Sequence, residues 1–179
     1  MTDISILEAD ITTLPVDAIV NAANSSLLGG GGVDGAIHRA AGPELVRECA
    51  ELGGCDPGDA KVTKAYALPA TWVIHAVGPV WMGGGEHEAE TLASCYSRSL
   101  TLAMEKGARS ISFPAISCGV YAYPVLAAAR IAVHEIRAFV AKHPKAFKQI
   151  YLVCFGQPVY EAYQQAWRME GACYQSKSG

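Results

Sequence analysis

Residues 20–38 read VNAANSSLLGGGGVDGAIH, in which four consecutive glycines separate a polar segment from an acidic residue. A short apolar strand, 18–20, is predicted to lead into this segment, and a helix is predicted to begin at residue 33. A glycine run between a strand and a helix lets main-chain N–H groups approach a ligand closely, and phosphate is the usual ligand of such a surface. The stretch therefore predicts a phosphate-binding loop with Asn24 and Asp34 at its two ends.

Strand and helix patterns alternate along the rest of the chain. Apolar runs predict strands at 4–8, 62–67, 72–77, 110–113 and 149–155, and helical spacing predicts helices at 33–38, 44–52, 87–106, 124–140 and 158–169. This alternation is typical of an α/β domain whose largely parallel sheet is covered by helices on both faces. Ligands of such domains bind at the carboxyl ends of the strands, where the glycine run lies.

The size and composition suit one compact domain. We assign residues 1–170 of the 179 to a single domain and residues 171–179 to a flexible C-terminal tail. A hydrophobic content of 51% and a charged content of 17% argue against a disordered chain. The net charge of -3 and the scattered lysines and arginines provide no electrostatic surface for DNA, although main-chain amides can still bind a nucleotide phosphate.

The six cysteines are spread along the chain and no secretory segment is evident, so we expect reduced thiols and a cytoplasmic protein. No apolar run reaches about 18 residues, which predicts that the chain does not cross a membrane. The cysteines and histidines show no C-x-x-C or H-x-x-x-H spacing, so neither a metal site nor a cofactor is expected.

Gly30, Gly32 and Gly35 also satisfy G-x-G-x-x-G, which raises a dinucleotide-binding dehydrogenase as an alternative. In that fold the first glycine follows its strand directly, whereas here residues 21–28 intervene. The acidic residue expected about 20 positions later should end a second strand, but Asp56 lies in a predicted turn. An NAD-dependent oxidoreductase is therefore disfavoured.

A second loop, residues 113–124 with the sequence FPAISCGVYAYP, also joins a predicted strand to a predicted helix. Two such loops can clamp a diphosphate, and Tyr121 could either pack against the sheet or face the ligand and cover a sugar. Cys118, just before the helix, raises covalent catalysis as an alternative. The phosphatase spacing C-x5-R fails, because Pro124 stands where the arginine is needed.

Simpler structural roles remain open for several of these residues. Asn24 could hydrogen-bond its own turn, Asp34 could be a first-turn acid favoured by the helix dipole, and Asp10 could cap a turn. His38 and His75 lie in apolar patterns, where hydrogen-bonded core histidines are commoner than catalytic ones. We therefore leave both histidines out of the mechanism.

Four motifs in the same order resemble the MacroD-type macrodomains: NAAN at 21–24, LLGGGGVDGAIHRAAG at 27–42, HAVGPVW at 75–81 and PAISxGVYxYP at 114–124. The resemblance extends from about residue 4 to residue 169. It implies a three-layer α/β/α sandwich with a mixed, largely parallel central sheet that binds ADP-ribose. It also implies hydrolysis of O-acetyl-ADP-ribose and of mono-ADP-ribose esters on acidic residues of proteins.

The resemblance further implies a role for each matched residue. Asp10 accepts a hydrogen bond from the adenine amino group beside the Ile11 amide, and Phe155 stacks on the adenine ring. Asn24 holds the distal ribose hydroxyls, while Asp34 orients or activates the hydrolytic water. Because an ionised aspartate is a weak base, our own hypothesis is that a ligand phosphate helps to orient or activate that water. The remaining ligand-binding residues that it implies are Asn21, Gly31, Gly32, Val33, Ser117, Cys118, Gly119, Val120 and Tyr121.

The chain departs from the family pattern at three positions, where Ala9 and Ala122 replace glycines and Cys118 replaces a threonine. If residue 122 has a positive φ, alanine costs about 1 kcal/mol there and stiffens or shifts the loop. The alternative function is an ADP-ribose reader module with little or no turnover. Asp34 argues against it, because a reader needs no water-orienting carboxylate.

Overall fold

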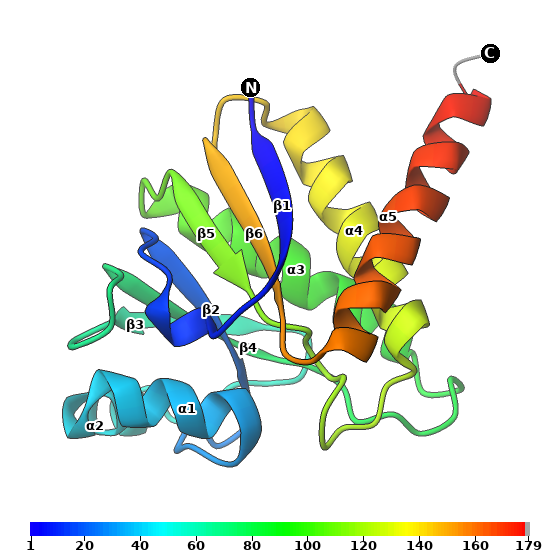
Figure 1. Ribbon diagram of the computed structural model, residues 1–179. Helices are drawn as coiled ribbons and strands as arrows, with labels where there is room; N and C mark the ends of the chain where they lie inside the picture. The colour runs from blue at the N-terminus through cyan, green and yellow to red at the C-terminus, as the bar shows by residue number, and fades with distance from the viewer. Residues whose placement is uncertain (178–179) are drawn as a thin grey trace.

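The computed structural model describes residues 1–177 as one sheet flanked by helices (Figure 1). The strands are β1 (Asp3–Glu8), β2 (Ala18–Ala23), β3 (Ala60–Lys64), β4 (Trp72–Val77), β5 (Ser110–Phe113) and β6 (Gln149–Cys154). The helices are α1 (Gly32–Ala41), α2 (Pro43–Glu51), α3 (Glu88–Glu105), α4 (Val125–Lys142) and α5 (Gln157–Lys177), with a short 3-10 helix, η1 (Ile11–Thr13). Of the helices within residues 1–177, none combines the length and the apolarity that a membrane span requires. The order of the strands and α-helices is the one expected from the sequence.

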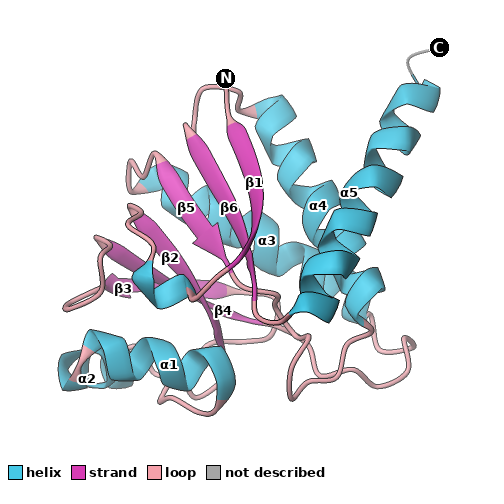
Figure 2. Ribbon diagram, viewed as in Figure 1, coloured by secondary structure: helices cyan, strands magenta, loops and turns pink. Residues whose placement is uncertain are grey.

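The strands form one mixed sheet in the order β1-β6-β5-β2-β4-β3. Neighbouring strands are parallel except for β3, which runs antiparallel to β4. The helices α1 and α2 pack on one face, and α3, α4 and α5 pack on the other (Figure 2). The expected three-layer α/β/α sandwich with a mixed, largely parallel sheet is therefore confirmed.

Successive residues of the inner strands face different helices. In β2, Ala18 and Val20 belong to the core beneath α3, α4 and α5, whereas Ile19 and Ala23 belong to the core beneath α1 and α2. Because both faces of the sheet are covered, these strands are apolar at nearly every position instead of alternating with polar residues. The continuous apolar runs in the sequence reflect this double burial.

The last helix is longer than expected. The apolar spacing fades after Met169, yet α5 continues to Lys177. Gly171 lies within the helix, and the Arg137 guanidinium lies 3.6 Å from where a Cβ atom would be, an ordinary van der Waals distance. The expected end of this helix near residue 169 is therefore corrected: the backbone is helical to Lys177, and residues 178–179 lie outside the described part of the chain.

The sheet topology gathers the candidate residues along one edge. The strands β1, β6, β5 and β2 are neighbours and run parallel, so their carboxyl ends lie side by side. The chain leaves this edge through η1, through residues 155–156, through the β5–α4 loop (residues 114–124) and through the glycine loop (residues 24–31). All residues that the sequence analysis singled out for ligand binding lie in these segments or next to them.

Candidate functional site

The glycine loop enters α1 through a bend that its glycines permit. Gly32, the first residue of α1, has a φ of 59°, a left-handed conformation that costs other residues energy. Gly35 lies so close to the loop that a Cβ atom would be 2.5 Å from the Gly30 carbonyl oxygen. At Gly31, by contrast, a Cβ atom would meet no protein atom within 4 Å. The loop therefore packs onto α1 on one side and borders open space on the other.

The two polar residues at the ends of the loop meet at Gly30. A Cβ atom placed there would lie 3.2 Å from Asp34 Oδ2 and 3.4 Å from Asn24 Nδ2. Asn24 also supports its own turn, because its Nδ2 donates to the Gly29 carbonyl oxygen at 3.0 Å and its Oδ1 accepts from the Leu27 amide at 3.2 Å. The structure thus brings the Asn24 carboxamide near the Asp34 carboxylate, and the local turn role is fulfilled as well.

Asp34 lies in the first turn of α1 and is only 5% exposed. Its Oδ1 accepts a hydrogen bond from Asn21 Nδ2 at 2.8 Å and lies 3.3 Å from His38 Nε2. The N-terminal end of a helix favours a carboxylate at this position. The side chain of Asn21, which we expected among the ligand-binding residues, is fully buried and supports Asp34 from within the sheet.

The two histidines differ from each other. His75 is a buried core residue, as expected, with Nδ1 at 3.1 Å from Asn21 Nδ2 and Nε2 at 2.9 Å from Thr63 Oγ1. Burial and, to a lesser extent, the neighbouring His38 lower the pKa of His75 to about 3, so its ring is neutral. His38 is partly exposed and its Nε2 faces Asp34. The four-residue spacing of Asp34 and His38 on one helix face is the signal that the sequence reasoning overlooked.

One group of side chains is spaced closely enough to suggest metal ligation. Within the described residues, only His38, Cys49 and His75 offer three ligand atoms that lie within 4.8 Å of one another. Burial raises the pKa of the Cys49 thiol to about 11. His75 Nε2 already contacts Thr63 and lies 3.6 Å from Cys49 Sγ. We therefore interpret the group as a hydrogen-bonded core cluster.

The β5–α4 loop has two non-glycine residues in the left-handed region, Ser117 with φ of 66° and Ala122 with φ of 60°. The Ser117 hydroxyl donates to the Pro79 carbonyl oxygen at 2.8 Å, and the Ser117 carbonyl oxygen accepts from the Tyr123 amide at 2.9 Å. The positive φ at Ala122 fulfils the condition considered from the sequence. Alanine therefore carries a strain at this position that glycine would avoid.

The tip of this loop, residues 119–121, faces outward. A Cβ atom on Gly119 would meet no protein atom within 4 Å, and Val120 is 91% exposed. Cys118 turns inward, where its amide and its thiol donate to carbonyl oxygens of the same loop at 3.3 and 3.5 Å. Burial raises the pKa of Cys118 to about 12, so this thiol lacks the character of an activated nucleophile.

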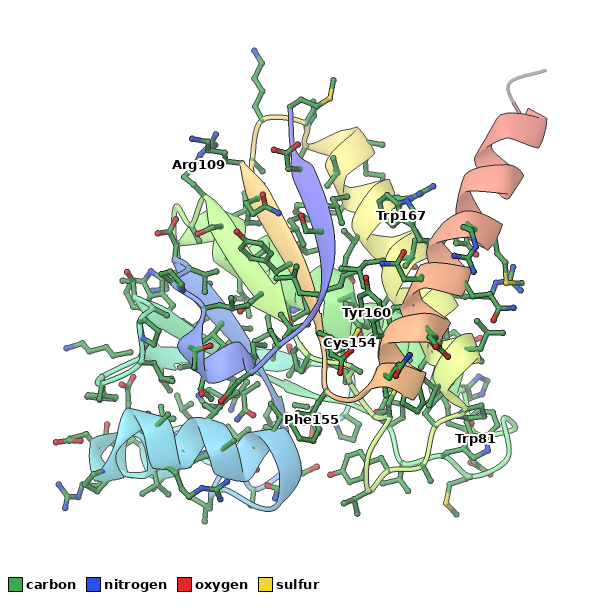
Figure 3. The ribbon with its side chains drawn as sticks, viewed as in Figure 1. Trp81, Arg109, Cys154, Phe155, Tyr160 and Trp167 are labelled. Atoms are coloured by element: carbon green, nitrogen blue, oxygen red, sulfur yellow. The ribbon has the colours of Figure 1, made fainter. Side chains whose placement is uncertain are left out.

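At the other end of the edge, Asp10 and Phe155 follow two paired strands. Glu8 of β1 is paired with Cys154 of β6, so the chain leaves the sheet at neighbouring points. Asp10 Oδ1 accepts from the Thr12 hydroxyl at 2.7 Å and from the Thr12 amide at 3.0 Å, and these hydrogen bonds lower the pKa of Asp10. Phe155 is 90% exposed at the carboxyl edge of the sheet, between α1 and α5 (Figure 3). An exposed ring beside a hydrogen-bond acceptor suits a planar base with an amino group.

The remaining expected residues vary in exposure. Ile11 is buried, Val33 and Tyr121 are partly buried, and the glycine loop from Gly30 to Gly32 is exposed. Main-chain amides are the groups expected to bind a ligand in these segments, so a buried side chain does not remove a residue from the site.

A third loop, residues 78–87, supports the β5–α4 loop, a role that the sequence analysis did not assign to it. A Cβ atom at Gly78 would overlap the Ser117 side chain, so the two loops are in close contact. Glu88, buried at the start of α3, accepts hydrogen bonds from three amides of the loop at distances from 2.6 to 2.9 Å. The GPVW sequence directly after β4, part of the HAVGPVW motif, is the local signal for this role.

Comparisons with known proteins agree with this architecture. Residues 20–132 match the family model described as Macro domain. A macro domain-containing protein of Chlorobaculum tepidum is 59% identical over 160 residues, covering 89% of this chain and 92% of the relative. A Citrobacter rodentium protein named O-acetyl-ADP-ribose deacetylase is 52% identical over 172 residues, covering 94% of this chain and 97% of the relative. The structure of a Trypanosoma brucei macrodomain in complex with ADP-ribose has a TM-score of 0.86 at 48% identity, covering 90% of this chain and 68% of the solved one. These matches and the observed fold show that the chain belongs to the macro domain family.

Proposed function

We propose that this protein binds ADP-ribose and hydrolyses the ester bonds of O-acetyl-ADP-ribose and of mono-ADP-ribose attached to acidic residues of proteins. The observation that carries the proposal is the buried Asp34 carboxylate, which faces Gly30 of the glycine loop close to the Asn24 carboxamide. The relative named O-acetyl-ADP-ribose deacetylase and the macrodomain solved with ADP-ribose support it.

The ligand spans the carboxyl edge of the sheet. Adenine stacks on Phe155, and its amino group donates to Asp10. The diphosphate binds between the glycine loop and the tip of the β5–α4 loop, where main-chain N–H groups and the start of α1 favour negative charge. This order leaves the distal ribose beside Asn24 and Asp34, at the bond to be cleaved.

The reaction consumes one water molecule. In O-acetyl-ADP-ribose the water oxygen attacks the acetyl carbonyl carbon, the bond from that carbon to the ribose oxygen breaks, and the ribose oxygen takes up a proton. Asp34 accepts a hydrogen bond from the water, and Asn24 holds the neighbouring ribose hydroxyl. A carboxylate is a weak base, so orientation supplies much of the rate, and a phosphate oxygen of the ligand accepts the second hydrogen bond of the water.

The test compares the wild type with Asp34→Ala, Asp34→Asn and Asn24→Ala. Released ADP-ribose is measured with O-acetyl-ADP-ribose and with a protein mono-ADP-ribosylated on an acidic residue, and ADP-ribose binding is measured by calorimetry. We expect both Asp34 variants to lose about 100-fold or more in kcat while they still bind ADP-ribose. Asn24→Ala should reduce both kcat and affinity, because its carboxamide also shapes the glycine loop.

Asp56→Ala is the matched control, since Asp56 is an exposed aspartate outside the site. Its kinetics should equal those of the wild type. Turnover that survives both Asp34→Ala and Asn24→Ala would overturn the mechanism. Wild-type protein that binds ADP-ribose and cleaves neither substrate is a reader module, and the hydrolase proposal then fails.

A further inference from the structure

A chain of hydrogen-bonding side chains runs through the sheet to Asp34. Asn21 and His75 are paired residues of the adjacent strands β2 and β4, and Thr63 lies on β3 at the far side of β4. Thr63 Oγ1 is 2.9 Å from His75 Nε2, His75 Nδ1 is 3.1 Å from Asn21 Nδ2, and Asn21 Nδ2 is 2.8 Å from Asp34 Oδ1. Thr63, His75 and Asn21 are each at most 1% exposed.

The hydrogens in the hydrogen-bonded series Thr63–His75–Asn21–Asp34 can be assigned. The Asn21 amide nitrogen carries two hydrogens, and one of them goes to Asp34 Oδ1. The other can go to His75 Nδ1 only if that nitrogen carries no proton, which leaves the His75 proton on Nε2. Nε2–H then donates to Thr63 Oγ1, and the Thr63 hydroxyl donates to the Lys64 carbonyl oxygen at 3.0 Å. Each donor in this hydrogen-bonded series has one acceptor.

The opposite orientation of the Asn21 amide is unfavourable. It would turn Asn21 Oδ1 toward the Asp34 carboxylate, so two acceptors would face each other. In the observed orientation Oδ1 is buried and has no hydrogen-bond partner among residues 1–177, and this unmet acceptor is a cost. The hydrogen bonds that Asn21 donates to Asp34 and His75 must outweigh this cost.

We propose that His75 is a positioning residue, whose Nδ1 holds the Asn21 carboxamide so that it donates to Asp34 and fixes that carboxylate for the hydrolytic water. His75 acts through Asn21 and contacts neither water nor ligand. The inference rests on the proposed function of Asp34 for its effect on rate, but the tautomer and the amide orientation are properties of the folded protein alone.

The first test is therefore made without substrate. Nitrogen-15 NMR of the wild-type imidazoles between pH 5 and pH 8 should show a neutral His75 with its proton on Nε2. A proton on Nδ1, or a charged ring in this range, would overturn the proposal whether or not the protein is a hydrolase.

The second test uses two variants of equal shape. The oxygen of His75→Asn can occupy the place of Nδ1 and accept from Asn21, whereas His75→Leu has the same branching and no acceptor. Both leave a similar space, so a purely structural role would affect them alike. We expect His75→Leu to lower kcat by about 10-fold to 100-fold with KM within about 3-fold of the wild type, and His75→Asn to retain most of kcat.

The Asn21 side-chain amide provides a readout that needs no turnover. Its NMR signals should be protected from solvent exchange in the wild type and in His75→Asn, and less protected in His75→Leu. Equal behaviour of the two variants in kcat and in amide exchange would contradict the proposal. If wild-type turnover is absent but the tautomer and the exchange difference are as expected, the proposed function fails and the positioning of Asn21 stands.

Discussion

The Trp81 amide donates a hydrogen bond to the Tyr121 carbonyl oxygen at 2.8 Å. This bond joins the 78–87 loop to the outward-facing tip of the β5–α4 loop, and the Ser117 hydroxyl makes a second link to the Pro79 carbonyl oxygen at 2.8 Å. Trp81 also packs against Tyr123, with ring centroids 4.7 Å apart. The shape of the proposed diphosphate loop therefore depends on a neighbour that lies outside the proposed ligand contacts.

Gly78→Ala should disturb this contact. A methyl group at Gly78 would overlap the Ser117 Oγ atom and lie 2.7 Å from a side-chain carbon of Ile116, so the β5–α4 loop must shift. We expect a loss of about 1 to 3 kcal/mol in the free energy of unfolding. ADP-ribose affinity, measured by calorimetry, should fall by about tenfold, as for one lost hydrogen bond.

Gly85→Ala is the matched control in the same loop, because a Cβ atom there meets no protein atom within 4 Å. It should leave both stability and affinity close to the wild type. Equal effects of the two substitutions would show that the contact between Gly78 and Ser117 has no special importance.

Glu88→Gln should weaken the same loop from its other end. Burial alone would raise the pKa of Glu88, but the hydrogen bonds from the amides of the loop outweigh it and lower the pKa to about 2. Because this folded-state pKa lies below the ordinary value of 4.5, the ionised carboxylate contributes stability above pH 4.5 that is lost as the pH falls toward 2. The substituted glutamine would turn its own amide group toward N–H donors, so the melting temperature at pH 7 should drop.

The measurement is the difference in melting temperature between the wild type and Glu88→Gln from pH 7 to pH 2. The difference should shrink below pH 4.5, where the unfolded wild type takes up a proton on Glu88 while the folded protein keeps the carboxylate ionised until the pH approaches 2. Glu90→Gln serves as the control, because the Glu90 side chain is 75% exposed. A difference that stays constant with pH would exclude a stabilising role for the ionised Glu88.

Much of the fold could be predicted because the pattern of burial is visible in the sequence. Strands such as β2 and β4 are buried on both faces and read as continuous apolar runs, while α3 and α4 show helical spacing. The end of α5 could not be predicted in this way, because the apolar spacing fades after Met169 while the helical backbone continues to Lys177.

The site was predicted less completely, for a related reason. Asn24 and Asp34 flank a local motif, so their proximity follows from ten residues of sequence. Asn21 and His75 are 54 residues apart and meet only through the register of β2 and β4. Glu88 looks like an ordinary first-turn acid until the loop folds back over it. Contacts of this kind arise from the tertiary structure and leave no local pattern.

Ala122→Gly should relieve strain in the β5–α4 loop. The φ of 60° at Ala122 costs an alanine about 1 to 2 kcal/mol, whereas glycine adopts it freely. Glycine also makes the unfolded chain more flexible, which costs about 0.4 to 1 kcal/mol. We expect the free energy of unfolding, measured with urea, to rise by up to about 1.6 kcal/mol.

Ala67→Gly is the comparison for this substitution, because Ala67 is also an exposed loop residue but lacks a positive φ. It should lose about 0.4 to 1 kcal/mol of stability, since only the unfolded-state term remains. If Ala122→Gly destabilises the protein as much as Ala67→Gly does, the strain assigned to residue 122 is absent.

The buried His75 should make the protein less stable in mild acid. Its folded-state pKa of about 3 lies below the ordinary value of 6.5, so the unfolded chain takes up a proton first as the pH falls. The neutral ring faces His38, Cys49, Thr63 and Asn21, none of which is an acid that could stabilise an added charge. The contribution of the neutral His75 ring to the free energy of unfolding is complete above pH 6.5. It is lost as the pH falls toward 3, at up to about 1.4 kcal/mol per pH unit.

The measurement is the free energy of urea unfolding of the wild type and of His75→Asn at roughly spaced pH values of 7.5, 6.0, 5.0 and 4.5. The difference between the two proteins isolates the contribution of His75, because the contributions of the other histidines cancel. The stability of the wild type relative to His75→Asn should decrease steadily below pH 6.5. His87→Asn is the control, since His87 is 87% exposed and its φ of 59° is one that asparagine tolerates. A difference between the wild type and His75→Asn that does not vary with pH would mean that His75 can be protonated in the folded protein, and Nδ1 could then not serve as the acceptor that holds Asn21.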